Sequence, residues 1–209
     1  MRVEKRYEGD IWAEARPSCR PVLLRTEPTT LRRGDFALFA PTLHIGSSNH
    51  VGLVGDNGTG KSTLVTRIAE TLPVDVHCLL IPQEPDESRK LETMKALQSF
   101  PADQRGRVLS IVAQLNSDPV RLLEGGSVSP GEMRKLMLAL GILEKPELIV
   151  MGEPTSHLDI GSVEALQRLI AAWPGALLLV SHDAAIVQAS TSIIWETETC
   201  AGGFRLVVR

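Results

Sequence analysis

Residues 51–64 read VGLVGDNGTGKSTL: an apolar run, a glycine-rich turn and the start of a helical pattern. The pattern G-x-x-x-x-G-K-S runs from Gly55 to Ser62. Glycines allow the dihedral angles and close approach by which backbone N–H groups converge on phosphate oxygens. The following helix would present its positive N-terminal end to the same anion. The stretch therefore predicts a phosphate-binding loop between a strand and a helix.

Two side chains at the end of this loop suit a nucleotide carrying magnesium. Lys61 would supply a positive charge to the β- and γ-phosphates, and the Ser62 hydroxyl can ligate Mg²⁺. The alternative, a glycine-rich turn with an incidental lysine, does not explain the strand before it and the helix after it. The predicted nucleotide-binding residues of this segment are Gly55, Asp56, Asn57, Gly58, Thr59, Gly60, Lys61, Ser62 and Thr63.

Strands and helices alternate around this loop, which predicts an α/β fold with a mainly parallel sheet covered on both faces. The 209 residues fit a single domain, with residues 1–33 as an N-terminal segment containing an edge strand and about 84–127 as an inserted helical subdomain. A hairpin is expected near the C-terminus, joined through Gly202 and Gly203. Apolar periodicity predicts helices at 61–72, 130–143, 163–172 and from 184, and strands at 36–45 (broken by Pro41), 51–54, 74–81, 148–151, 176–180, 192–196 and 204–208.

The composition is that of an ordinary globular protein with no strong charge bias. Hydrophobic residues make up 43% and charged residues 22%, with a formal net charge of -3. A protein that binds nucleic acids mainly through contacts to the phosphate backbone would usually be basic, so extensive nucleic-acid binding is not supported. The first residues, MRVEKRYEGD, lack the apolar core of a secretory signal. No apolar run reaches the ~20 residues of a membrane helix, so we expect a cytoplasmic protein without direct membrane insertion.

A second informative stretch, residues 148–159, reads LIVMGEPTSHLD. It is an apolar strand running into an acidic turn, which is where a carboxylate can activate water beside a bound nucleotide. Glu153 is such a carboxylate. The preceding residue is Gly152, where a second carboxylate would orient the waters of Mg²⁺.

Three further segments carry polar residues at the ends of predicted elements. Gln83 follows a strand in IPQE, and His182 follows another in LVSHD. Taken alone, the glutamine could be a surface residue and the histidine a structural one. Residues 128–132, VSPGE, form an S-x-x-E capping box with proline at the first helical position, which by itself explains a helix start.

Together these segments resemble an ABC-type ATPase cassette over nearly the whole chain. The wording EPTSHLD is close to the EPTNHLD typical of the ABC-F group, which mostly acts on ribosomes, and SPGEMRKL with VSHD is similar to that group's second cassette. The resemblance implies a P-loop NTPase fold with an antiparallel β portion near the N-terminus. It also implies that ATP and Mg²⁺ are the cofactors and that a second cassette is the partner, in a homodimer or heterodimer.

The resemblance also implies roles for individual residues. Glu153 and His182 would be catalytic, the first polarising the attacking water and the second sensing the γ-phosphate. Gln83 would contact Mg²⁺ and the water. Ser129, Gly131 and Glu132 would form the signature that acts across a dimer; the proline between them removes one backbone N–H from that surface.

The expected function is an ATP-binding cassette that dimerises around ATP and hydrolyses it slowly, because Gly152 stands where the family has an aspartate. Two alternatives stay open at this point. One is an ATP-binding interaction module with negligible hydrolysis, and the other is the ATP-binding subunit of a membrane transporter. The sequence names no macromolecular target and leaves ATP or GTP preference open.

Overall fold

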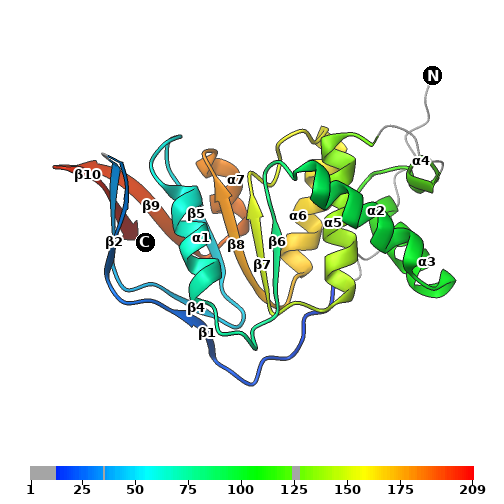
Figure 1. The fold of residues 1–209 in the computed structure, drawn as a ribbon, viewed down its shortest axis with the longest axis horizontal. Coiled ribbons are helices and arrows are strands. Elements are labelled where there is room, and N and C mark those ends of the chain that lie inside the picture. The colour runs from blue at the N-terminus through cyan, green and yellow to red at the C-terminus, as the bar shows by residue number, and fades with distance from the viewer. Residues whose placement is uncertain (1–12, 35, 124–127) are drawn as a thin grey trace. The chain divides into compact units, whose positions relative to one another are not determined.

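The computed structural model describes residues 13–34, 36–123 and 128–209 (Figure 1). These residues fall into two compact units. We call residues 16–80, 146–154 and 174–209 the sheet unit, and residues 81–145 and 155–173 the helical unit. The first part of the expected N-terminal segment, 1–12, and residues 124–127 of the expected helical subdomain lie outside the described residues.

The sheet unit is built on an eight-stranded sheet of order β2-β3-β10-β9-β5-β8-β7-β6. Its central pairs, β9 with β5, β5 with β8 and β8 with β7, are parallel, whereas β2 with β3 and β9 with β10 are antiparallel. The strands are β2 (Thr29–Arg33), β3 (Phe36–Ala40), β5 (His50–Val54), β6 (Cys78–Ile81), β7 (Leu148–Gly152), β8 (Ala176–Ser181), β9 (Ile193–Cys200) and β10 (Gly203–Val208). This confirms the predicted α/β fold, its antiparallel strands near the N-terminus and the C-terminal hairpin.

Each face of the central strands is buried by a different helix of this unit. Leu53 on β5 belongs to a core cluster with Leu64 and Ile68 of α1 (Lys61–Thr71). Successive strand residues point to opposite faces, so Gly52 faces away from α1. A Cβ built on Gly52 would lie 1.9 Å from the Val187 side chain of α7 (Ala184–Ser190). Glycine thus lets α7 approach the sheet on the face opposite α1, and the loop after β5 leads into α1.

The helical unit contains five helices among the described residues: α2 (Glu87–Ser99), α3 (Ala102–Gln114), α4 (Pro119–Leu123), α5 (Pro130–Leu143) and α6 (Ile160–Ala172). Helix α5 contacts both α2 and α3, and buried Leu97, Val108 and Leu136 supply apolar surface from these helices. Aspartates cap α2 and α6, because Asp86 accepts from the Arg89 N–H and Asp159 from the Ser162 N–H. Within the described ranges, no helix combines the length and apolar character needed to cross a membrane.

Three of the element boundaries that differ from the predicted ones have a clear local reason. The strand predicted at 74–81 begins only at Cys78, because the Val76 N–H bonds to the Pro73 carbonyl in a turn. The helix predicted at 163–172 begins at Ile160, next to its Asp159 cap. The broken strand predicted at 36–45 splits between sheets: β4 (His44–Gly46) pairs instead with β1 (Val22–Arg25).

Candidate nucleotide-binding site

The predicted phosphate loop joins β5 to α1 in the sheet unit. Gly55, Gly58 and Gly60 have φ angles of 148°, 83° and 91°, in the positive-φ region that residues other than glycine rarely adopt. The last of them is the residue before α1 and leads directly into Lys61. Asp56, Asn57 and Gly58 are exposed, Thr59 is buried, and Ser62 and Thr63 lie in the first turn of α1. All nine predicted residues of this segment are thus brought into one loop and one helix start.

The Lys61 ammonium lies against the backbone of this loop. Its Nζ donates to the Gly55 carbonyl at 2.6 Å and to the Asp56 carbonyl at 2.8 Å. Burial lowers the pKa of Lys61 from its usual 10.5, while the negative charges of Glu153 and Asp56 oppose that shift. The loop therefore holds a poorly hydrated cation where a phosphate would lie, and an anionic ligand would compensate part of its lost hydration.

Glu153 lies directly beyond the end of β7, and its carboxylate is buried. One oxygen accepts from the Ser181 hydroxyl at 2.8 Å, and the other accepts from the His182 N–H at 3.0 Å and lies 2.9 Å from His182 Nδ1. Strands β7 and β8 are parallel, with Gly152 opposite Val180, so their carboxyl ends meet at one edge of the sheet. The structure therefore brings the two predicted catalytic residues together.

The backbone at Glu153 is unusual for a residue with a side chain. Its φ is 43°, in the left-handed region, and such a conformation persists only where the surroundings enforce it. Here the Glu153 N–H donates to the Val180 carbonyl at 2.6 Å, which extends the pairing of β7 and β8 by one residue. The carboxylate is therefore held by its backbone as well as by its side-chain partners.

The residues that would meet a magnesium ion are few. Ser62 offers an exposed hydroxyl in the first turn of α1, and Gly152 offers no side-chain ligand. Among the residues that the structure describes, no three His, Cys, Asp or Glu side chains are grouped as a metal site. This donor set does not fit a metal held by protein alone, but it fits an ion carried in on nucleotide phosphates that keeps most of its waters. Gln83, the other predicted magnesium ligand, is an exposed residue of the helical unit.

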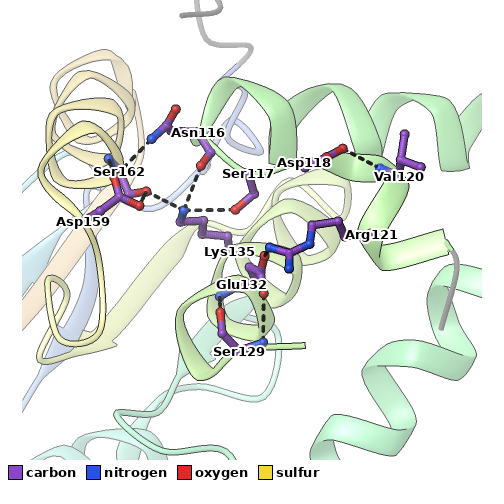
Figure 2. A network of polar contacts seen from close by, with 10 residues as sticks. All are labelled: Asn116, Ser117, Asp118, Val120, Arg121, Ser129, Glu132, Lys135, Asp159 and Ser162. Carbon is purple, nitrogen blue, oxygen red and sulfur yellow. Dashed lines mark hydrogen bonds and ion pairs between the residues drawn. The ribbon is translucent and has the colours of Figure 1, made fainter. Parts of the chain in front are cut away.

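A separate polar site lies at the start of α5 in the helical unit (Figure 2). Ser129 Oγ accepts from the Glu132 N–H at 3.2 Å, and the Glu132 carboxylate accepts from the Ser129 N–H at 2.9 Å. Burial alone would raise the pKa of Glu132, but the Ser129 hydrogen bonds and the charges of Arg121 and Lys135 outweigh it and lower that pKa. The predicted capping box is present, and Ser129 at its start is exposed.

Gly131 packs tightly against the turn that precedes α6. A Cβ built on Gly131 would lie 2.4 Å from the His157 carbonyl oxygen, which no real side chain tolerates. His157 itself has a φ of 62°. The predicted signature residues and the 155–159 turn therefore form one continuous surface within the helical unit.

Lys135 ties three segments of the helical unit together, although nothing in its sequence context predicted it (Figure 2). Its Nζ donates to Ser162 Oγ at 2.5 Å and to Ser117 Oγ at 3.0 Å. Burial lowers the pKa of Lys135, and the charges of Asp159 and Glu132 oppose the shift. A cavity of about 390 Å³ lies beside this network and is lined by Asn116, Ser117, Asp118, Arg121, Ser129, Gly131, Glu132, Lys135, His157 and Asp159.

A phosphate loop, a strand-end glutamate paired with a histidine, and a capped serine helix are the parts of an ATP-binding cassette. The pattern of the family described as "ABC transporter" matches residues 38–156, more than half of the chain. This chain belongs to that family. The predicted ABC-type cassette is confirmed, and relatives of the chain include proteins of the ABC-F type.

Curated relatives fall into two kinds. The Tylosin resistance ATP-binding protein TlrC of Streptomyces fradiae is 33% identical over 158 residues, covering 70% of this chain and 28% of that protein. The Ribosome protection protein VmlR of Bacillus subtilis is 30% identical over 188 residues, covering 81% of this chain and 33% of that protein. The chain thus spans about a third of such relatives. The Zinc import ATP-binding protein ZnuC of Pseudomonas fluorescens is 29% identical over 199 residues, covering 87% of this chain and 76% of that protein.

Solved structures share the fold at low sequence identity. An ATP-binding subunit of an ABC transporter has a TM-score of 0.69 at 20% identity, covering 90% of this chain and 89% of that one. An archaeal ribosome recycling factor, aABCE1, in complex with a ribosomal stalk protein, has a TM-score of 0.67 at 20% identity, covering 92% and 40%. At this identity the likeness concerns the fold alone.

Proposed function

We propose that this chain is a cytoplasmic ATPase cassette of the ABC-F type, which hydrolyses ATP slowly. The observation that carries the proposal is the pairing of Glu153 with Ser181 and His182 at the sheet edge. That pairing orients a carboxylate in the sheet unit that also holds Lys61, and the electrostatic influence of Glu153 reaches the Lys61 ammonium.

Each predicted site residue of the sheet unit then has a defined role. The loop amides and Lys61 bind the β- and γ-phosphates, and Ser62 contributes an oxygen to the magnesium ion that arrives with them. That ion neutralises phosphate charge. Glu153 accepts a hydrogen bond from the attacking water and orients it, and His182, whose Nδ1 lies 2.9 Å from the Glu153 carboxylate, senses the γ-phosphate.

The slow rate follows from Gly152. A carboxylate at that position would accept hydrogen bonds from magnesium-bound waters, and the loss of such a partner typically costs about 10- to 100-fold in metal affinity or activity. Ser62 and the phosphates still hold the ion, but they orient its waters less firmly. Nucleotide binding depends on the loop and Lys61 and is expected to be retained.

The signature surface of the helical unit supports a dimer. Ser129 is exposed, and Gly131 and Glu132 lie in the first turn of the helix that it caps. We propose that this surface meets the γ-phosphate bound by a second cassette, which is either another copy of this chain or a different one. ATP then favours the dimer, because each nucleotide is contacted from both partners.

The ribosome is the proposed target, on the strength of the relatives. EPTSHLD at residues 153–159 and the similarity to the Ribosome protection protein VmlR both favour it. The similarity to a zinc import ATP-binding protein over 76% of that protein's length favours the second candidate, a transporter subunit. Co-sedimentation with purified ribosomes in ATP separates the two, since a transporter subunit would stay in the supernatant.

Phosphate release in saturating Mg²⁺ and ATP tests the catalytic part of the proposal. Wild-type protein is expected to turn over slowly, and Glu153→Gln is expected to fall to background while still binding ATP. Tight ATP binding with no wild-type phosphate release over hours would replace this function by the third candidate, an ATP-binding interaction module. That candidate is favoured by Gly152, because no carboxylate is available at that position to orient magnesium-bound waters.

A further inference from the structure

The phosphate loop is attached to a strand far from it in sequence. Thr197 lies on β9, one residue beyond Glu196, which pairs with Val54 at the end of β5. Its hydroxyl donates to Thr59 Oγ1 at 2.8 Å, and both side chains are buried, with exposures of 9% and 3%. The Val54 carbonyl is a longer alternative acceptor at 3.4 Å. A hydroxyl of β9 therefore lies directly beneath the loop.

The contact continues through the loop to the lysine. Thr59 Oγ1 donates its own proton to the Asp56 carbonyl at 2.9 Å. The same carbonyl accepts from Lys61 Nζ at 2.8 Å. One chain of hydrogen bonds thus runs from Thr197 through Thr59 to the carbonyl that holds the phosphate-binding cation.

The same threonine also restricts the first residue of the loop. A Cβ built on Gly55 would lie 1.8 Å from Thr197 Oγ1 and 3.0 Å from its Cβ. Gly55 has a φ of 148°, so both its backbone conformation and its contact with β9 require glycine. Thr197 therefore contacts the loop at its first residue and, through Thr59, near its end.

We propose that Thr197 is a positioning residue for nucleotide binding: its hydroxyl fixes the phosphate loop in the conformation that receives the phosphates. The proposal rests on the nucleotide-binding function proposed above and adds a residue outside the loop to it. In this role Thr197 acts on nucleotide binding through Thr59. Replacing its hydroxyl by a methyl group leaves the buried Thr59 oxygen without its donor, which costs about as much as a lost hydrogen bond.

Four variants separate this role from simple packing. Thr197→Val keeps the shape and removes the hydroxyl, and Thr197→Ser keeps the hydroxyl. Thr199→Val is the matched control, because Thr199 is an exposed threonine of the same strand. Thr59→Val removes the link between Thr197 and the rest of the loop.

Titration calorimetry with MgATP measures the effect. Thr197→Val is expected to weaken ATP binding about 5- to 20-fold, as loss of one buried hydrogen bond implies, whereas Thr197→Ser and Thr199→Val stay within about 3-fold of wild type. In a Thr59→Val background, Thr197→Val is expected to add little, because the two act as a unit. Wild-type affinity in Thr197→Val, or equal losses in Thr197→Val and Thr197→Ser, would overturn the proposal.

Amide hydrogen exchange of the nucleotide-free protein tests, independently of ATP, whether Thr197 stabilises the conformation of the phosphate loop. Amides of residues 56–62 are expected to exchange faster in Thr197→Val than in wild type or Thr199→Val, while amides of β8 stay protected. Unchanged exchange in the loop would overturn the proposal. Failure of the wild-type protein to bind ATP would instead count against the proposed function. The hydrogen-exchange result would still test whether Thr197 fixes the loop.

Discussion

The hydroxyl of Ser181 donates a hydrogen bond of 2.8 Å to the carboxylate of Glu153 and is almost fully buried, with 1% exposure. Ser181 Oγ also accepts a hydrogen bond from the Asp183 N–H at 3.0 Å. Ser181 is the last residue of β8, and His182, the other partner of that carboxylate, follows it directly. The end of one strand thus provides two side chains that orient the glutamate at the end of its neighbour.

Removal of the Ser181 hydroxyl is expected to slow hydrolysis without weakening substrate binding. In Ser181→Ala the carboxylate loses one hydrogen bond, so kcat is expected to fall about 10- to 100-fold, the range for a hydrogen bond to a charged group, with KM nearly unchanged. Steady-state phosphate release measures both constants. Ser192→Ala, at an exposed serine beyond α7, is the control, and a Ser181→Ala protein with wild-type kcat would show that this contact does not matter for the reaction.

Addition of one methyl group at Gly131 is expected to disturb the signature surface. The new Cβ meets the His157 carbonyl oxygen at 2.4 Å, so Gly131→Ala is expected to cost about 1–3 kcal/mol of stability and to abolish ATP-dependent dimerisation. ATP binding to the phosphate loop is expected to persist.

Chemical unfolding and light scattering with and without ATP measure these two effects. Gly106→Ala is the matched control, because no atom lies within 4 Å of a Cβ built there in α3. Alanine is the better helix former, so this variant is expected to gain about 0.5–1 kcal/mol. If Gly131→Ala dimerised normally in ATP, the signature surface would not be the dimer contact.

Loss of the Lys61 charge is expected to abolish nucleotide binding. Lys61→Met keeps most of the aliphatic side chain in its buried position and removes the ammonium that the Gly55 and Asp56 carbonyls hold. The ATP dissociation constant is expected to rise at least about 100-fold, as loss of a desolvated charge partner implies. Calorimetry checks this, and micromolar binding by Lys61→Met would mean that the loop amides suffice.

Asp159 is expected to make the stability of the helical unit sensitive to acid. Burial alone would raise the pKa of Asp159, but hydrogen bonds from Ser162 and the charge of Lys135 outweigh it and hold that pKa below 3.8. A carboxyl whose folded pKa is depressed contributes stability above its unfolded pKa and loses it as the pH falls through the folded value.

Asp159→Asn removes this titration and keeps a residue that can cap α6. Urea unfolding at pH 7, 4 and 3 is expected to show wild type as the more stable protein at pH 7, with the difference narrowing below pH 3.8. If the difference in unfolding free energy between wild type and Asp159→Asn stayed constant down to pH 3, protonation of Asp159 would not contribute to the acid sensitivity of the fold.

The sequence was most informative where the function and the local backbone conformation require the same residue types. The three glycines at 55–60 have to adopt positive φ angles for a phosphate loop, and all three do. The S-x-x-E pattern at Ser129 predicted a helix start that the structure contains. Apolar periodicity alone was less accurate: it missed the start of α6, because Ile160 is 81% exposed, and it extended β6 backward over the fully exposed Val74.

Contacts between distant residues could not be predicted from sequence. Thr59 and Thr197 are 138 positions apart, and Lys135 and Ser162 are 27 apart. Each pair exists because strand order or helix packing brings two unrelated segments together. Thr197 and Lys135 carry no motif in their own neighbourhoods, so their roles required the fold.

We propose that the nucleotide site lacks only the carboxylate that Gly152 does not supply. The most direct test is the kcat of Gly152→Asp against wild type across a magnesium titration. The kcat of Gly152→Asp is expected to rise about 10- to 100-fold, and half-maximal activity is expected to need less magnesium, while ATP affinity changes little. A Gly152→Asp protein with wild-type turnover and wild-type magnesium dependence would contradict it.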